Sequence, residues 1–416
     1  MKLAIIATTF AVRGGAENMI LKLADELLRR GHQVTIFTSE HQPDDPDIPE
    51  MVRPCFVDIA AGGHYSTWID WLWAGLKLRR RLQEFDLVNP HNFPANVWVY
   101  YAKLFSRAFP PIIWYCHEPS RQLYDQSPPE QVGRYTSLTT HVCEKFQQHG
   151  LDALWRLLQK SVFYGIQALC GRRLRAFHTR LDQRAVHSCD RILANSRYTA
   201  SKIQAIYGIP ATVCYQGITP VPRGPLPDRA NKSYFLTVAR LERLKHVDTV
   251  IQALDMLIHR HHQCNIMLRV VGTGTQEAAL HALVQELQLH DAVVFPGYVA
   301  DADMHRLYAD ALAVVYVPVD EPFGLVPLEA MMHATPVIVS NSGGTVETVK
   351  NHETGLHVEP GNIEQLAEAM LWLAQHREQA AQMGKCGYAH VMRQWTVKHF
   401  VDRFEQMIGF REDVAA

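Results

Sequence analysis

Two glutamates and a pair of cations in this sequence could bind or act on a ligand. The glutamates, Glu321 and Glu329, stand eight positions apart in the segment EPFGLVPLEAM. On one continuous helix, eight residues span about 12 Å and leave the side chains about 80° apart, so the carboxylates would not meet on one atom. Because Pro322 and Gly324 disfavour a helix that starts at Glu321, we expect Glu321 in a loop and Glu329 early in a helix.

This arrangement suits a ligand with two separate polar ends. A helix that starts near Val326, with Pro327 in its first turn, offers free N–H groups to an anion. A diphosphate there, with one carboxylate at each end, matches a nucleotide-sugar, because carboxylates accept hydrogen bonds from vicinal hydroxyls. Glu329 would then hold the ribose and Glu321 the sugar. Taken alone, Glu329 is better explained as a first-turn glutamate favoured by the helix dipole.

The cations are Arg240 and Lys245 in the segment VARLERLKHVD, which follows a predicted strand. Two cations at the end of a strand suit a pyrophosphate, because guanidinium and ammonium groups both bind phosphate oxygens. Without the other motifs, two solvent-exposed surface cations would be the simpler interpretation.

Predicted strands and helices alternate in two runs along the chain, and they hold these four residues in place. The first run begins with a buried strand, the Gly14-Gly15 turn and a helix over 16–30. Strand–helix alternation of this kind predicts an α/β fold of two doubly wound domains, and ligands gather at the carboxyl ends of such strands. The predicted strands are 2–8, 32–39, 85–92, 111–118 and 190–196, then 233–241, 265–274, 292–298, 311–318, 335–340 and 355–360.

The domain boundaries follow from this pattern. We expect an N-terminal domain over 1–218, a proline-rich linker over 219–232 and a C-terminal domain over 233–395. The remaining residues, 396–416, are expected to form a helix that packs back on the N-terminal domain.

The composition narrows the class of protein. The chain has 416 residues, a net charge of −1 and eight cysteines without a C-x-x-C pair, which argues against nucleic-acid binding and for a reducing compartment. The start, MKLAIIATTF, is followed at once by charged residues, so a buried strand explains it better than a signal peptide. No segment reaches the length of a membrane span, and we expect a cytoplasmic protein.

One segment points to a membrane surface. Residues 151–187 hold seven Arg or Lys and two Asp among many apolar residues. A basic amphipathic helix of this kind suits peripheral contact with an anionic membrane, and an ordinary packed helix with a solvated basic face is the alternative. The tryptophan-rich stretch 66–81, with its basic end, supports the membrane interpretation.

Three other patterns resemble metal-binding or dinucleotide-binding motifs but are better explained without such a ligand. Asp301-Ala302-Asp303 has a metal-binding form, but it precedes an evident helix and is expected to be its N-cap. The histidines of HRHHQC (259–264) are expected to be solvated at a helix end, so no metal site is predicted. The segment RGGAE is not G-x-G-x-x-G, which argues against a dinucleotide redox enzyme.

The motifs together resemble a known family. EPFGLVPLEAM is similar to the E-x7-E motif of retaining glycosyltransferases of family 4, which have the GT-B fold of two Rossmann-like domains facing across a cleft. VARLERLKH matches the family's Arg and Lys. The resemblance is good at both ends of the chain and poor over about 120–190. It extends over VGTGTQEAAL (271–280), VFPGYVADADMHRLYADA (294–311), PVIVSNSGGTVETV (336–349), NHETGLHVEP (351–360) and RGGAENMILKLADELLRRGHQVTIFT (13–38).

The resemblance implies roles for individual residues. Arg240 and Lys245 would bind the donor diphosphate, Glu329 the ribose and Glu321 the donor sugar. His117, in WYCHEPS, would approach the C6 hydroxyl of the sugar, although a structural histidine is the alternative. The remaining implied binding residues are Gly14 and Gly15 beside the phosphate and acceptor, the backbone amides of Phe323, Gly324 and Leu325, and Gly297, Tyr298 and Val299 near the base.

The resemblance also implies a reaction. VVYVPVDEPFGLVPLEAM and YCHEPSRQLYD are most similar to GDP-mannose-dependent mannosyltransferases of lipid-linked oligosaccharide or polysaccharide assembly. GDP-mannose is therefore the expected donor, and a saccharide or lipid-linked saccharide the expected acceptor, with no cofactor and no metal. The alternatives are a transferase that uses UDP-glucose or UDP-N-acetylglucosamine, a GT-B-fold UDP-N-acetylglucosamine epimerase, or a catalytically silent partner subunit.

Overall fold

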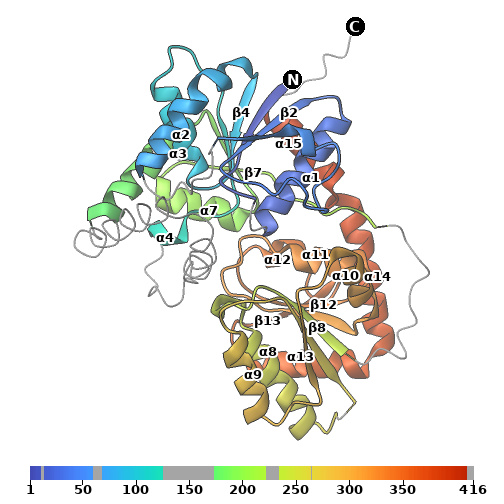
Figure 1. Cartoon of the computed structure of the whole chain (residues 1–416). Helices are drawn as coiled ribbons and strands as arrows, with labels where there is room; N and C mark the ends of the chain where they lie inside the picture. The colour runs from blue at the N-terminus through green and yellow to red at the C-terminus, as the bar shows by residue number, and fades with distance from the viewer. Residues whose placement is uncertain (11–13, 60–67, 125–172, 222–233, 264, 410–416) are drawn as a thin grey trace.

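The computed structural model in Figure 1 describes residues 1–10, 14–59, 68–124, 173–221, 234–263 and 265–409. The N-terminal domain, coloured blue to green, lies above the C-terminal domain, coloured yellow to orange. Residues 151–172 of the predicted basic segment and residues 222–232 of the predicted linker lie outside the described residues.

The N-terminal domain is built on parallel strands in the order β3-β2-β1-β4, followed by a second set in the order β5-β6-β7. Isolated parallel bridges from Val88 to Ile112 and from His91 to Tyr115 connect β4 to β5. In β1, Leu3 to Ile6 are all fully buried, as expected for a parallel strand covered on both faces. The strands are β1 (Lys2–Ile6), β2 (Gln33–Thr38), β3 (Phe56–Asp58), β4 (Leu87–Pro90), β5 (Ile113–Cys116), β6 (Arg191–Ala194) and β7 (Thr212–Val213).

Helices cover this sheet. Ser196 caps α7 by accepting a hydrogen bond from the Thr199 amide, and Gly208, with φ of 72°, ends that helix in the left-handed conformation. The helices are α1 (Gly15–Arg29), α2 (Trp68–Arg81), α3 (Ala95–Leu104), α4 (Arg121–Tyr124), a helix over 173–187 and α7 (Arg197–Tyr207), with short 3-10 turns η1 (Arg53–Cys55) and η2 (Leu82–Glu84).

The C-terminal domain has a six-stranded parallel sheet in the order β10-β9-β8-β11-β12-β13. The chain reverses direction across this sheet between β8 and β11, which is the switch point where ligands bind in doubly wound folds. Its strands are β8 (Tyr234–Val238), β9 (Met267–Val271), β10 (Val293–Gly297), β11 (Ala313–Tyr316), β12 (Val337–Ser340) and β13 (Gly355–Val358). Its helices are η3 (Arg243–Lys245), α8 (Val247–Asp255), η4 (Met256–Arg260), α9 (Glu277–Glu286), α10 (Asp301–Asp310), α11 (Leu325–Met332), α12 (Thr345–Thr348), α13 (Ile363–Gln375) and α14 (Arg377–Gln394).

The last helix, α15 (Val397–Met407), returns to the N-terminal domain and appears in red among the blue elements of Figure 1. Phe400 and Phe404 join the buried core that surrounds β1 and α1. Arg30, which caps the C-terminal end of α1, binds the carboxylates of Asp402 and Glu405, each at 2.7 Å. The chain therefore crosses between the domains twice.

The two crossings lie against each other. The Ile218 amide donates to the Trp395 carbonyl at 2.8 Å, and the Val397 amide donates to the Ile218 carbonyl at 2.9 Å. A side chain on Gly217 would place its Cβ 2.2 Å from the Thr396 carbonyl oxygen, so only glycine allows this approach.

The predicted class, two doubly wound α/β domains, is confirmed. Strands β3 and β7 were not predicted, because runs of three and two residues carry no clear alternation. The prediction that the Asp301 motif is an N-cap is wrong by one residue. Ala300 has the extended backbone of the cap, and Asp301 is the first residue of α10.

Candidate active site

The centre of the site is an ion pair between Lys245 and Glu321. The Lys245 Nζ lies 2.6 Å from Glu321 Oε2, and both side chains are mostly buried. The Tyr316 hydroxyl lies 3.5 Å from the same Nζ and also hydrogen-bonds Glu321. Burial, followed by the nearby Glu321 carboxylate, holds the pKa of Tyr316 well above its usual value, so this phenol stays neutral. The structure thus brings together two of the predicted site residues and adds Tyr316.

Glu329 lies early in α11, as predicted, but in the second turn, so it is not the first-turn glutamate of the alternative interpretation. Its Oε2 accepts a hydrogen bond of 2.8 Å from the Tyr308 hydroxyl of α10. Its backbone carbonyl lies 2.8 Å from Nδ1 of His333, whose ring stacks on Tyr308. The carboxylate is therefore held by one phenol, with acceptor capacity left for a ligand hydroxyl.

The N-terminus of α11 is shaped by Gly324. This residue has φ of 87°, and a Cβ there would lie 2.7 Å from the Thr345 methyl group. No side chain caps the helix, so the amides of its first turn, beginning at Leu325, keep their donors. Phe323 is buried against Tyr215 and Trp395, which anchors the loop before the helix.

The Gly14-Gly15 turn faces this helix from the other domain. A Cβ on Gly15 would lie 3.5 Å from the Leu325 Cδ1, so the starts of α1 and α11 lie close together where the two domains meet. The Gly14 amide donates to Glu17 Oε2 at 2.8 Å. Burial raises the pKa of Glu17, while its backbone hydrogen bonds and the charge of Arg240 act against that rise, so Arg240 of the C-terminal domain lies near Glu17. Arg240 itself is exposed.

His117 follows β5 and lies in a buried row of polar side chains. Its Nε2 is 2.9 Å from His91 Nδ1, and its Nδ1 is 2.7 Å from Gln216 Nε2. His91 Nε2 lies 2.8 Å from Asn89 Oδ1, and Asn89 Nδ2 donates to the Ile113 carbonyl. Because a carbonyl only accepts, Asn89 uses its amide nitrogen as the donor there and its Oδ1 accepts from His91 Nε2. His91 Nδ1 then accepts from His117, which carries its proton on Nε2.

Burial keeps both rings of this row neutral. It lowers the pKa of His117 to about 3 and also lowers the pKa of His91. Both nitrogens of His117 are bound to protein atoms, so contact with a sugar hydroxyl would require one of these hydrogen bonds to open. His91 was not predicted as a site residue, although it stands at the polar end of a predicted strand.

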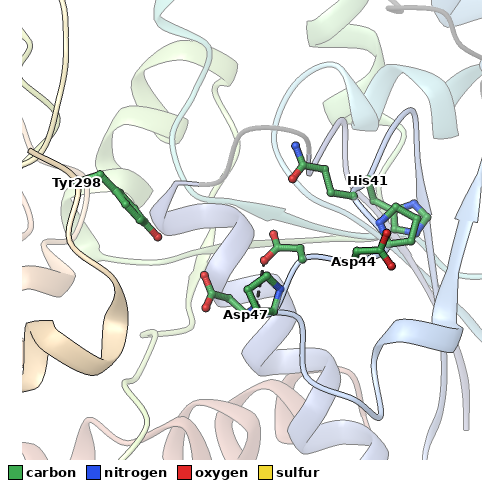
Figure 2. Close-up of a pocket in the computed structure, with 8 residues that line it drawn as sticks. His41, Asp44, Asp47 and Tyr298 are labelled. Atoms are coloured by element: carbon green, nitrogen blue, oxygen red, sulfur yellow. Dashed lines mark hydrogen bonds between the residues drawn. The ribbon is translucent and has the colours of Figure 1, made fainter.

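Tyr298 lies in the loop after β10, beside Gly297 and Val299. Its side chain is 73% exposed. Figure 2 shows it facing the loop that holds His41, Asp44 and Asp47 across a hollow of about 610 Å³. Both domains therefore line this acidic hollow, whose size is ordinary for a small-ligand pocket. Val299 packs against the core around α11.

Three further residues, none predicted from the sequence, join the domains beside Glu321, and a fourth pairs with one of them. Arg121 donates to the Asp320 carbonyl at 2.9 Å, and Ser196 donates to the Pro322 carbonyl at 2.5 Å. Glu347 accepts from the first two amides of α7, and Glu118 pairs with Arg121. Burial is the largest cause that raises the pKa of Glu118, and the nearby negative charge of Glu321 raises it further.

Metal ligands are not gathered anywhere in the described ranges. No group of three or more His, Cys, Asp or Glu residues with metal-binding geometry occurs there. Positive charge at the described site comes from Arg240, Lys245 and the start of α11.

Comparison with known proteins agrees with this geometry. Residues 13–221 match the family model for Glycosyltransferase Family 4, and residues 223–390 match that for Glycosyl transferases group 1. The alpha-1,3/1,6-mannosyltransferase of Mus musculus is 24% identical, with 95% of this chain and 93% of that protein covered.

Two other relatives match over a shorter span. A GDP-mannose-dependent alpha-(1-6)-phosphatidylinositol monomannoside mannosyltransferase of Mycobacterium tuberculosis is 32% identical over 48% of this chain and 56% of that enzyme. An uncharacterized glycosyltransferase of Methanocaldococcus jannaschii is 30% identical over 45% of this chain and 53% of that protein. This chain thus spans about half the length of these two relatives.

Solved structures share the whole fold. Sucrose-phosphate synthase of Thermosynechococcus elongatus superposes with a TM-score of 0.71 at 20% identity, covering 98% of both chains. Anabaena HepE in complex with UDP has a TM-score of 0.69 at 18% identity, covering 98% of this chain and all of that one. With family models matching both halves and a GT-B fold throughout, the chain belongs to glycosyltransferase family 4 and is a glycosyltransferase that takes a nucleotide-sugar donor and a saccharide acceptor.

Proposed function

We propose that this enzyme transfers mannose from GDP-mannose to a saccharide or lipid-linked saccharide, with retention of the anomeric configuration and without a metal. The observation that carries the proposal is the row formed by Lys245, Glu321, the open start of α11 and Glu329. A nucleotide-sugar fits this row with its sugar at Glu321, its diphosphate at the helix start and its ribose at Glu329.

The positive charges beside the proposed diphosphate position favour the bond cleavage that transfer requires. When the sugar–phosphate bond breaks, negative charge develops on the leaving diphosphate and positive charge develops at the anomeric carbon. Lys245, Arg240 and the amides of α11 stabilise the diphosphate, which is the work a metal does in other transferases. Glu321, freed from part of its pairing with Lys245, faces the sugar.

Retention is proposed to follow from attack on the face that the diphosphate leaves. Glu321 is already engaged by Lys245 and Tyr316, so it orients the sugar and does not serve as a covalent nucleophile. In same-face attack the leaving phosphate takes the proton of the acceptor hydroxyl. The bond to the acceptor oxygen then forms where the bond to phosphate breaks.

Mannose and guanine are preferred because of the relatives. Two of the relatives described above are mannosyltransferases, and one of them is GDP-mannose-dependent. A UDP-sugar is the alternative donor, since the similar fold of HepE holds UDP.

Calorimetric titration with GDP and with UDP tests the donor. We expect GDP to bind, UDP to bind at least about tenfold more weakly, and Glu329→Ala to weaken GDP binding by about tenfold through loss of a ribose hydrogen bond. Glu364→Ala, at an exposed carboxylate on α13, is the control and leaves binding unchanged. A preference for UDP would replace the mannosyl assignment with the UDP-sugar alternative. Product analysis without an acceptor would reveal an epimerase.

We also propose that the enzyme contacts an anionic membrane through its N-terminal domain. Support comes from the helix over 173–187, where four arginines and Phe177 are exposed, and from the adjacent α2. The Phe177 ring lies 5.8 Å from that of Trp68, and Ile69 and Trp73 of α2 are also exposed. Apolar rings beside several arginines suit the interface of an anionic bilayer. No helix among the described residues is long and apolar enough to cross a membrane.

A further inference from the structure

The loop that carries Glu321 is held at three consecutive carbonyls. The Asp320 carbonyl accepts from Arg121 Nη2 at 2.9 Å, and the Glu321 carbonyl accepts from the Gly344 amide at 2.7 Å. The Pro322 carbonyl accepts from Ser196 Oγ at 2.5 Å. The Thr199 hydroxyl also donates to the Pro322 carbonyl, at 3.4 Å. Three of these four donors, Arg121, Ser196 and Thr199, belong to the N-terminal domain, while Glu321 belongs to the C-terminal domain.

The hydrogen bond from the Gly344 amide to the Glu321 carbonyl lies within the C-terminal domain. Gly344 lies so close to the loop that a Cβ there would be 2.3 Å from the Pro322 carbonyl oxygen. This contact stays within one domain, so movement between domains does not affect it. The hydrogen bonds from Arg121 and Ser196 form only while the two domains are together.

A carboxylate holds the donating helix in place. Glu347 of α12 accepts hydrogen bonds of 2.9 Å from the amides of both Arg197 and Tyr198, and one of 2.8 Å from the Tyr215 hydroxyl. An anion at the N-terminus of a helix is favoured by the helix dipole and by the unpaired amides. Glu347 therefore docks the start of α7 against the C-terminal domain.

Ser196 links this docking to the Glu321 loop. Its hydroxyl oxygen accepts from the Thr199 amide at 2.9 Å as the N-cap of α7, and its proton is donated to the Pro322 carbonyl. One hydroxyl thus fixes the helix start and the loop at once. Tyr316 and Lys245 then hold the Glu321 side chain from within its own domain.

We propose that Arg121, Ser196 and Glu347 are positioning residues that fix the Glu321 loop when the domains come together, so that domain docking completes the sugar site. They act through the loop and not by touching the substrate. The inference rests on the proposed role of Glu321 at the donor sugar. Nucleotide binding by Arg240, Lys245 and Glu329 does not depend on it, because those residues all lie in the C-terminal domain.

The test compares Ser196→Ala and Glu347→Gln with the wild-type enzyme. We expect kcat for transfer to fall by about 10- to 100-fold, because displacement of a positioned group by about 1 Å has effects of this size. The dissociation constant for the nucleoside diphosphate, measured by calorimetry, is expected to stay within about twofold. Ser196→Thr keeps the hydroxyl and is expected to restore kcat.

The matched control is Ser106→Ala. Ser106 also donates its hydroxyl to a backbone carbonyl, that of Ala102 at 2.7 Å, but within the N-terminal domain. This variant is expected to keep the wild-type kcat. Unchanged kcat in Ser196→Ala, or an equal loss of kcat and of nucleotide affinity, would overturn the proposal.

Hydrogen exchange gives a readout that does not need turnover. The peptide over 317–332 is expected to exchange faster in Ser196→Ala and Glu347→Gln than in wild type, while Ser106→Ala leaves it unchanged. Equal exchange in all four proteins would overturn the positioning role. Absence of nucleotide binding in the wild type would instead contradict the proposed function, so the two failures are distinguishable.

Discussion

At the scale of single residues, the donor site pairs its charges before a ligand binds. Lys245 neutralises Glu321 at 2.6 Å, with Tyr316 beside both side chains, so neither charge is buried alone. In the proposed donor site, a diphosphate would offer Lys245 a second anion and release part of the Glu321 carboxylate to the sugar. The same ion pair would then stabilise the free site and serve the proposed reaction.

Lys245→Ala tests the proposed role of this cation in the reaction. We expect kcat to fall by about 10²- to 10³-fold, because one stabiliser of the leaving group is lost. Nucleoside diphosphate binding, measured by calorimetry, is expected to weaken as well. Lys350→Ala is the control, since Lys350 pairs with Glu353 at the exposed surface. A kcat close to wild type in Lys245→Ala would contradict the assignment of this cation to the diphosphate.

The buried histidine pair predicts how stability depends on pH. Burial lowers the pKa of His117 from 6.5 to about 3 and lowers that of His91 as well. Below pH 6.5 the unfolded chain binds a proton at each ring and the folded protein does not, so the free energy of unfolding decreases as pH falls. Each histidine contributes about 1.4 kcal/mol per pH unit to this slope, and nothing above pH 6.5.

Urea unfolding at about pH 7.5, 6 and 5 measures that slope. The double variant His91→Asn with His117→Asn is expected to lose less stability between about pH 6 and pH 5 than wild type does, by up to about 2.7 kcal/mol. His290→Asn, at an exposed ring, is the control. An unchanged slope in the double variant would show that these rings titrate in the folded protein.

At the scale of elements, α15 behaves as part of the N-terminal domain although it ends the described chain. Phe404 is fully buried in the core around α1 and β1. Phe404→Ala is therefore expected to reduce the free energy of unfolding by about 3–5 kcal/mol. Met392→Ala, at an exposed position on α14, is expected to change it by less than about 0.5 kcal/mol. Chemical denaturation measures both, and a small effect of Phe404→Ala would mean that α15 can leave this core.

The elements also show how far the sequence alone leads. Buried apolar runs predict the long strands, and Pro322 with Gly324 correctly places Glu321 in a loop before a helix that starts at Leu325. Those signals are local, because they depend on neighbours a few residues away. The hydrogen bond from Ser196 to Pro322 joins residues 126 positions apart, and no local pattern encodes it. The same holds for Tyr308 beside Glu329, 21 positions away on another helix.

At the scale of the whole molecule, the two domains present different surfaces. In Figure 1, α1 and α7 of the N-terminal domain lie above α11 and α12 of the C-terminal domain. The exposed rings of Trp68, Trp73 and Phe177 belong to the N-terminal domain alone. An enzyme attached to a membrane through that domain would keep its C-terminal domain free to move as the cleft opens and closes.

Vesicle cosedimentation tests this orientation. The Trp73 side chain is 58% exposed, and Arg173 and Arg180 are exposed on the adjacent helix. Vesicles of phosphatidylglycerol and phosphatidylcholine are expected to bind the enzyme, with each arginine near the surface contributing about 1 kcal/mol, or about fivefold in partitioning. Arg173→Gln with Arg180→Gln should therefore weaken binding by about 25-fold and reduce its dependence on salt.

The aromatic contribution separates insertion from simple charge attraction. Trp73→Ala is expected to weaken binding at high salt as well as low salt, because burial of an apolar ring is not screened by ions. Val294→Ala, at an exposed apolar position of the C-terminal domain, is the control and keeps wild-type binding. Equal binding to vesicles of phosphatidylcholine alone would remove the electrostatic part of the proposal. No binding to either vesicle would contradict membrane contact through this face.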